Sequence, residues 1–292
     1  MKSSIRCRAL FSAIRTPTLV ALVCLFPTFE LAGVQTQLPD SPSSATREQN
    51  RPAQGESRTQ GCCSRAQADS RSAESSFPGF VKRGIQDQVE IYTAPFHKSA
   101  LKWDFGLAAV TGGLIVVDPN ASRQFSDSPR TPSLRISDVG LYGTMGSVGV
   151  FYLSGAMTDN AHAKETGFLG AEAIANAAIT YTLLKTATGR ERPRVGAGNG
   201  RFWHYNRLGS SFPSGHATLS WAGAAVIAHE YPKRWVQVLT YGTAVAVSFT
   251  RYTGRAHFPS DLVVGSAVGY LIGSHIFKSH CRFDLSVDCK AN

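Results

Sequence analysis

Residues 249–262, FTRYTGRAHFPSDL, place Arg251, His257 and Asp261 in a run that one helix face could not present together. Pro259 is tolerated in the first turn of a helix, because that turn needs no intrahelical N–H donor at this position. The stretch therefore predicts a loop that carries His257 and a helix that begins just after it. Asp261 would lie on the first turn of this helix, close enough to His257 to fix the tautomer of its imidazole.

Helical patterning extends over most of the chain from about residue 80. Apolar segments rich in Ala and Gly alternate with charged or Pro/Gly loops, and alternating strand patterns are scarce. The sequence predicts an all-α fold, a helical bundle of about six to seven helices. The expected helical segments are 84–97, 103–117, 133–157, 164–188, 216–230, 233–250 and 260–278.

The lengths of the uncharged runs bear on whether these helices cross a membrane. A bilayer core requires ~20 consecutive apolar residues, and only the stretch between Asp138 and Asp159 reaches this length without a charge. The shorter runs favour core helices of a water-soluble or peripherally attached bundle. An integral membrane arrangement stays open as the alternative.

The N-terminal part of the chain has the composition of an export signal followed by a linker. A basic lead precedes a short apolar run, 19–26, which Pro27 ends before it could span a bilayer. We expect export to the periplasm or cell envelope, with the signal either cleaved or kept as an anchor. The next segment holds too few aliphatic side chains to offset the entropy of ordering. The expected organisation is a signal or anchor over 1–33, a disordered linker over 34–77, a folded domain over 78–280 and a tail over 281–292.

Charge and cysteine content restrict the partners and the compartment. Thirty Lys and Arg against 20 Asp and Glu give a formal charge of +10, which favours an anionic partner: nucleic acid, a membrane surface or a phosphorylated molecule. In an oxidising compartment, Cys281 and Cys289 would close a short loop in the tail. Cys62 and Cys63 are as consistent with free thiols as with disulfides.

Two further motifs join the opening stretch: KTATGRERP at 185–193 and SFPSGHA at 211–217. Together, the patterns K-x6-R-P, P-S-G-H and R-x5-H-x3-D resemble the three signature motifs of the type 2 phosphatidic acid phosphatase superfamily, which includes bacterial acid phosphatases and vanadium haloperoxidases. One such motif would be weak evidence, but three in order with intact spacing are specific. Thr250 stands where the family usually has Ser, a change that keeps the hydroxyl.

The resemblance implies a phosphohydrolase that works through a phosphohistidine intermediate. His257 would be the nucleophile, Asp261 would orient it, and His216 would act as general acid and then as general base. The implied phosphate-binding residues are Lys185, Arg192, Ser214, Gly215 and Arg251. Their chemistry suits this role, because guanidinium forks match phosphate oxygens and the N-terminus of a helix presents free backbone N–H groups. No metal or other cofactor is implied.

The substrate class and two other functions stay open. The expected substrate is a phosphorylated small molecule or a lipid phosphate, with no nucleic acid partner and a potential for association with a membrane surface. The alternatives are a vanadate-dependent haloperoxidase on the same fold and a non-catalytic envelope lipid-binding protein. Arg190, Arg194 and Arg255 are interpreted as solvated or steering charges, and His204 as a loop histidine.

Overall fold

The computed structural model describes residues 77–98, 100–126, 130–204 and 209–281. The predicted signal and nearly all of the predicted linker and tail lie outside these ranges, so the predicted organisation of the chain stays a prediction. Cys281 is disulfide-bonded, and Cys289, its predicted partner, lies outside the described residues.

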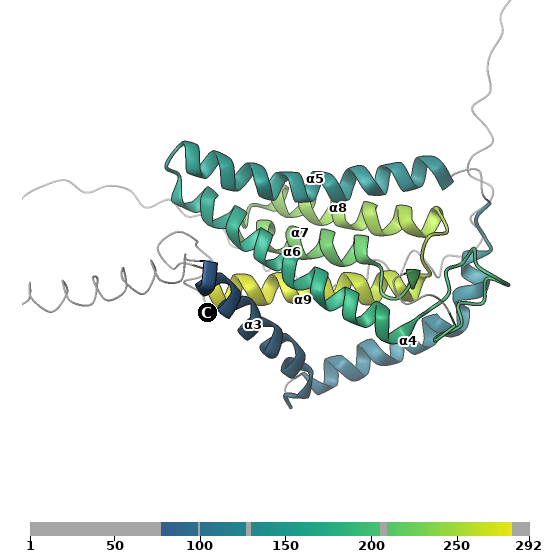
Figure 1. Ribbon diagram of the computed structural model, residues 1–292. Helices are drawn as coiled ribbons and strands as arrows, with labels where there is room; N and C mark the ends of the chain where they lie inside the picture. The colour runs from purple at the N-terminus through teal and green to yellow at the C-terminus, as the bar shows by residue number, and fades with distance from the viewer. Residues whose placement is uncertain (1–76, 99, 127–129, 205–208, 282–292) are drawn as a thin grey trace, which may run out of the picture. The chain divides into compact units, whose positions relative to one another are not determined.

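The described residues form seven α-helices and one short 3-10 turn, without a strand among them, which confirms the predicted all-α class. Each predicted segment corresponds to one helix, and the largest difference is at the first, which begins at residue 77 instead of 84. The elements are α3 (Phe77–Thr93), η1 (Ala94–Phe96), α4 (Leu101–Ser122), α5 (Arg130–Met157), α6 (Ala161–Thr188), α7 (Gly215–Glu230), α8 (Arg234–Thr253) and α9 (Pro259–His280) (Figure 1).

Helix α7 is the central helix of the bundle, because α5, α6, α8 and α9 all pack against it. All but three of its 16 residues are buried, and most of these are small. Its most extensive contact is with α9, where glycines allow close approach. A Cβ added to Gly269 would lie 2.2 Å from the carbonyl oxygen of Thr218, and one added to Gly273 would lie 2.4 Å from that of Ala222. This packing fixes the first turns of α7 and α9 relative to each other.

The three motifs meet where these helices begin and end. The backbone N–H of Ser214, before α7, donates to the carbonyl oxygen of Asp261 in α9, with an N–O distance of 3.0 Å. The hydroxyl of Thr188, at the end of α6, donates to the carbonyl oxygen of Phe212 at 2.9 Å. The predicted boundary after His257 is confirmed, since α9 begins at residue 259.

Ion pairs attach helix α3 to the bundle, among them one between Glu90 and His275 of α9 at 3.3 Å. Arg83 pairs with the buried carboxylate of Glu172 on α6. Asp87, also buried, accepts from Nε2 of His280 at the end of α9, with an N–O distance of 2.7 Å. These contacts join α3 to α6 and α9, so α3 packs as part of the domain.

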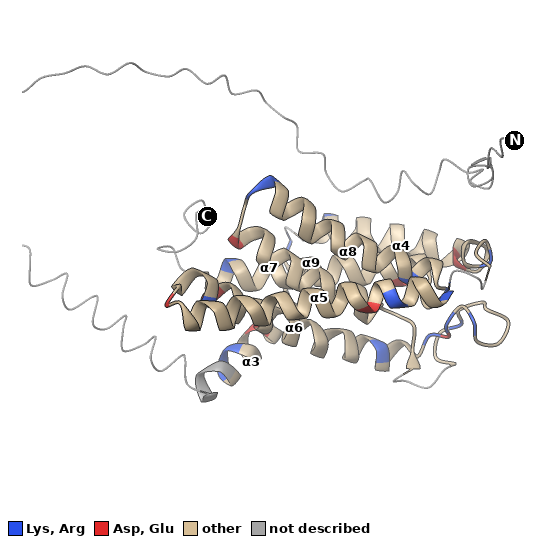
Figure 2. Cartoon of the chain, turned by 90° about the horizontal axis from the view of Figure 1, so that it is seen from above, with Lys and Arg blue, Asp and Glu red and all other residues tan. Residues whose placement is uncertain are grey.

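Among the described residues, three helices are long and apolar enough, by length and composition, to cross a membrane: α4, α6 and α9. Only 17% of the apolar window of α4 is buried, so the expectation of buried core helices throughout is wrong for α4. In Figure 2 the charged residues gather mainly near helix ends and in loops. The stretch 138–159 is the longest without a charge, but a spanning helix does not have to be free of charges along its whole length. A helix of 22 or 28 residues can carry a charge and still be apolar on average, whereas α5 is diluted by Gly, Ser and Thr.

Candidate active site

His257 lies in the loop between α8 and α9 and is 3% exposed. Its Nδ1 is 2.7 Å from the carbonyl oxygen of Ser211, which can only accept a hydrogen bond. Nδ1 therefore carries the proton, and the lone pair is on Nε2. The carboxylate of Asp261 lies 3.6 Å from Nδ1, beyond hydrogen-bond distance. In this arrangement the carbonyl of Ser211 accepts from Nδ1 and Asp261 lies beside the same nitrogen, so the orienting role predicted for Asp261 stays a prediction.

The electrostatic surroundings keep the imidazole of His257 neutral at physiological pH. Burial lowers the pKa of His257 to about 4; Asp261 opposes this shift, and the positive charges of Arg192 and Lys185 add to it. A neutral imidazole retains the Nε2 lone pair that a nucleophile requires.

His216 lies in the first turn of α7, in contact with one residue from α8 and one from α5. Its Nε2 is 2.9 Å from Oδ1 of Asp138, and Nη2 of Arg251 contacts the ring while lying 3.2 Å from the same carboxylate oxygen. Burial and the charge of Arg251 lower the pKa of His216 to about 4, while Asp138 acts to raise it. In the sequence, Asp138 stands out only as the end of an uncharged run. The one feature of the sequence that could have pointed to Asp138 is that this carboxylate stands alone before a long uncharged stretch.

Two buried polar atoms at this junction have no hydrogen-bond partner among the described residues: Oγ of Ser214 and Nε of Arg251. Ser214 is the fully buried N-cap residue of α7, yet its side chain makes no capping bond. Leaving a buried polar atom unsatisfied costs about 1–3 kcal/mol. Ser214 precedes His216 by two residues and Arg251 contacts the ring of His216, so both atoms lie near the first turn of α7.

The other predicted phosphate-binding residues surround the same junction. Gly215 faces the ring of Tyr181, which an added Cβ would approach to 3.1 Å. Nζ of Lys185 lies 5.4 Å from the centroid of that ring. Arg192 reaches the loop before His257, where its Nη1 lies 3.4 Å from the carbonyl oxygen of Ala256.

Arg190 is fully buried, so its interpretation as a solvated charge is wrong. Its Nη1 donates to Oδ1 of Asp261 at 2.6 Å and to Oγ of Ser260 at 2.7 Å. Its Nη2 donates to Oδ2 of Asp118, on α4, at 2.7 Å. The backbone N–H of Ser260 also donates to Asp118, at 3.2 Å. This network attaches the first turn of α9, and with it the loop of His257, to α4.

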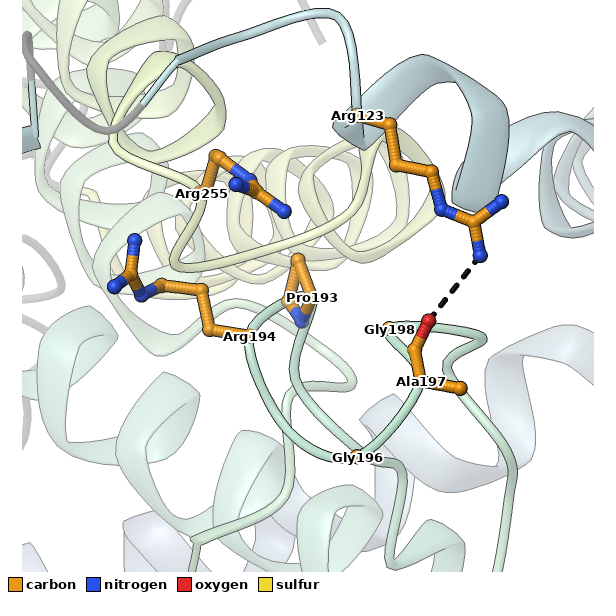
Figure 3. A pocket seen from close by; sticks show the side chains of 7 residues that line it. All are labelled: Arg123, Pro193, Arg194, Gly196, Ala197, Gly198 and Arg255. Carbon is orange, nitrogen blue, oxygen red and sulfur yellow. Dashed lines mark hydrogen bonds between the residues drawn. The ribbon is translucent and has the colours of Figure 1, made fainter.

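A cavity of about 230 Å³ lies beside these loops (Figure 3). None of the described residues that line it is acidic. The segment around Arg194 follows the first motif directly, and Arg255 lies two residues before His257. The lining residues are Arg123, Pro193, Arg194, Gly196, Ala197, Gly198 and Arg255.

Residues 167–283 match the family model described as the PAP2 superfamily, and this segment contains all three motifs. Over this segment the chain is similar to the PAP2 superfamily. The eight predicted site residues lie inside the match, whereas Asp118 and Asp138 precede it. Helices α4 and α5 thus add carboxylates that the matched segment does not contain.

Curated relatives match over a shorter part of the chain. Lipid A 1-phosphatase of Porphyromonas gingivalis is 34% identical over 91 residues, which is 30% of this chain and 18% of that protein. The lipid A 1-phosphatases of Rhizobium etli and Rhizobium johnstonii are each 36% identical over 95 residues, 31% of this chain and 40% and 38% of those proteins. The match thus spans less than half of each relative.

Among solved structures, a similar one is the first transmembrane PAP2 type phosphatidylglycerolphosphate phosphatase from Bacillus subtilis. It has 18% sequence identity and a TM-score of 0.44, and the similarity covers 69% of this chain and 96% of that one.

Proposed function

We propose that this chain is a membrane-associated phosphohydrolase that cleaves lipid phosphomonoesters. The observation that carries the proposal is the pair of buried, unsatisfied atoms, Oγ of Ser214 and Nε of Arg251, at the junction of the three motifs. A phosphate group offers acceptor oxygens to both, and the nearby cationic side chains balance its charge. The match of residues 167–283 to the PAP2 superfamily model and relatives named lipid A 1-phosphatase support the same chemistry.

The reaction would proceed in two steps. Nε2 of His257 attacks phosphorus and forms a P–N bond while the ester P–O bond breaks, and His216 donates a proton to the departing alkoxide oxygen. Water then attacks the phosphohistidine, His216 takes a proton from it, and the P–N bond breaks to release inorganic phosphate. Arg192, Lys185 and Arg251 would stabilise charge on the equatorial oxygens throughout. These side chains supply the positive charge, so we propose that turnover needs no metal.

The proposed location at a membrane follows from the length and the exposed apolar surface of the helices. Three of them are long and apolar enough to cross a bilayer, and α4 exposes most of its apolar window. A site at the ends of such helices can receive a headgroup while the acyl chains stay in the membrane. Together with the predicted signal over 1–33, this supports a cell-envelope enzyme whose site faces the periplasm.

Phosphate release tests the proposal directly. Full-length protein in detergent should release inorganic phosphate from a lipid phosphomonoester in the presence of a chelator. His257→Ala should abolish release, whereas His204→Ala should not change it, because His204 is an exposed loop residue. Normal turnover by His257→Ala would contradict the assignment of the nucleophile.

Trapping the intermediate tests the covalent step separately. Rapid quenching with a ³²P-labelled phosphoester should give acid-labile, base-stable label on the peptide that contains His257. His216→Ala should still take up label from an aryl phosphate, whose leaving group needs little protonation. Label on another residue, or turnover with no label in either protein, would contradict the two-step reaction.

A further inference from the structure

Trp203 lies in the loop between the first two motifs and presents its indole ring to the surface. The residue is 81% exposed. Its backbone φ is 58°, in the left-handed region, which is an outlier conformation for so bulky a side chain. Such strain persists only where the surrounding structure enforces it, and it indicates that the side chain is used.

Two hydrogen bonds hold Trp203 on the end of α6. Its backbone N–H donates to the carbonyl oxygen of Thr188 at 2.8 Å, and its indole Nε1 donates to that of Ala187 at 3.0 Å. Both carbonyls belong to the last turn of the helix, which has no intrahelical donors for them. The hydroxyl of Thr188 also donates to Phe212 in the second motif. Capping explains both N–H groups of Trp203 but not its exposed ring, which is thus held rigidly beside the phosphate site.

The outer face of α6 leads directly to this ring. Beyond Lys164, the exposed positions of the helix recur every four residues, and each holds an apolar side chain. They are Ala171, Ala175, Ile179, Leu183 and Ala187. Residues four apart lie on one face of a helix, and these extend over about 24 Å at ~1.5 Å per residue. A helix that faces water carries charged and polar residues on such a face.

Helix α8 has a similar outer face, although it is not among the three helices selected by length and composition. From Trp235 to the end of the helix at Thr253, its exposed residues are all apolar or glycine. They are Trp235, Val238, Leu239, Gly242, Ala246 and Phe249. Trp235, which is 66% exposed, follows Lys233 and Arg234 at the start of the helix.

The two exposed tryptophans lie at opposite ends of the bundle, along which α8 runs (Figure 1). Trp203 lies at the end where α7 begins. Arg251 of α8 contacts His216 at that same end, so Trp235 lies at the far one. From Trp235 to Thr253, α8 rises about 27 Å at ~1.5 Å per residue. The hydrocarbon core of a bilayer is about 30 Å thick, and Trp is enriched at both of its interfaces with water.

We propose that Trp203 is an interfacial anchor: its ring inserts among lipid headgroups and holds the phosphate site at the depth of the lipid phosphates, while Trp235 lies at the opposite interface. The proposal rests on the proposed phosphohydrolase activity and names the surface by which its site meets the membrane. The ring of Trp203 can enter the interface without an unpaired donor, because its N–H is already bonded to Ala187.

Depth-dependent quenching tests the location of the ring without any turnover. Full-length protein is reconstituted in phosphatidylcholine vesicles whose acyl chains carry bromine either near the headgroup or near the methyl end. The emission of Trp203 is the difference between wild type and Trp203→Phe. Bromine near the headgroup should quench it more than bromine near the methyl end, and aqueous iodide should quench it less than free tryptophan. The reverse order of the two lipids, or quenching by iodide alone, overturns the proposal.

Trp203→Gly tests the effect on the reaction without straining the fold, because glycine adopts a φ of 58° at no steric cost. Toward a lipid phosphomonoester in vesicles, this variant should lose about tenfold or more in kcat/KM, and toward a water-soluble aryl phosphate it should stay within about twofold of wild type. Trp203→Tyr should stay near wild type with both, since Tyr is also enriched at interfaces. An equal loss toward both substrates would show that the ring supports the site itself, and the anchor would be wrong.

A short-chain lipid phosphate, dissolved as monomers, distinguishes the bilayer from the headgroup as the partner of the ring. Trp203→Gly should hydrolyse it as wild type does. If the loss is as large as with vesicles, the ring binds the headgroup of the substrate and the proposal fails. If wild type hydrolyses none of these esters while the expected order of quenching holds, the proposed function fails and the anchor stands.

Discussion

At the scale of single residues, the contact between Asp138 and His216 predicts a shift in pH dependence. His216 must be protonated to act as general acid, and Asp138 acts to raise the pKa of His216 against burial and Arg251. In Asp138→Asn this contribution is lost, so the pKa of His216 falls and the protonated fraction is lost at lower pH. The descending limb of the pH profile of kcat/KM, which reports the free enzyme, should move to lower pH. An aryl phosphate serves as control because its leaving group needs little protonation. A limb that stays in place or moves upward would contradict the role of Asp138.

The buried pair of Asp118 and Arg190 predicts a large loss of stability from one small change. Asp118→Asn leaves the shape almost intact but removes the charge that faces a fully buried guanidinium. Breaking a buried pair by removing one partner costs about 3–5 kcal/mol. Thermal unfolding in detergent should show a strongly lowered midpoint, and kcat should fall because the first turn of α9 loses its attachment to α4. Asp159→Asn, at an exposed position between α5 and α6, is the matched control. Equal midpoints for the two variants would refute the importance of the pair.

Asp138 and Asp118 also show which parts of the site could be predicted from the sequence. The loop at His257 and the start of α9 follow from Pro259 and its neighbours, which are local signals. The partners of His216 and Arg190 are 78 and 72 residues away in the sequence. Such pairs depend on how α4 and α5 pack, and neither motif spacing nor charge encodes that packing. The carbonyl of Ser211, which accepts from Nδ1 of His257, was not predictable because every residue has one.

At the scale of helices, the close packing of α9 on α7 predicts that Gly269 cannot be replaced. A Cβ there would lie 2.2 Å from a backbone oxygen of α7, which cannot move without shifting the helix. Gly269→Ala should lower the free energy of unfolding by about 1–3 kcal/mol or more, as overpacking does. It should also reduce kcat, because the first turns carrying His216 and Asp261 would separate.

Gly242 of α8 provides the control for this change. No atom lies within 4 Å of the position that its Cβ would take. Gly242→Ala should therefore be neutral or stabilise the helix by up to about 1 kcal/mol through helix propensity. If both alanine variants unfold at the same temperature and keep full activity, the glycine contact between α7 and α9 is not what fixes the two first turns.

The number and order of helices were predictable from sequence, but their surroundings were not. Periodicity and loop signals gave seven segments, each of which is a helix in the structure. The exposure of α4 depends on which helices cover it, and the sequence holds no local signal for that. The same limit applies to the cavity in Figure 3, whose three arginines lie far apart in the sequence and whose shape depends on the turn at Gly198.

At the scale of the whole molecule, the exposed apolar surface of α4 predicts contact with lipid. Val110, near the middle of α4, is 44% exposed. In water, a polar substitution at such a surface position changes stability by about 0.5 kcal/mol or less. At the centre of a spanning helix, an aspartate costs about 2.5–3.5 kcal/mol. Val110→Asp in the full chain should therefore sharply reduce the folded protein recovered from membranes, measured as detergent-extracted material that still elutes as a single species.

The control for this prediction is the same charge placed on a loop. His204 is exposed and lies outside the helices, so His204→Asp should be recovered like wild type whether or not α4 lies in a bilayer. Alkaline carbonate extraction adds an independent measure, because a protein held only by its surface charge is released while one with spanning helices is retained. If Val110→Asp is recovered in full and the wild-type domain is released by carbonate once the signal is cleaved, α4 faces water and the membrane proposal is wrong. A retained wild type together with a poorly recovered Val110→Asp would instead place the phosphate site at the ends of spanning helices, within reach of a lipid headgroup.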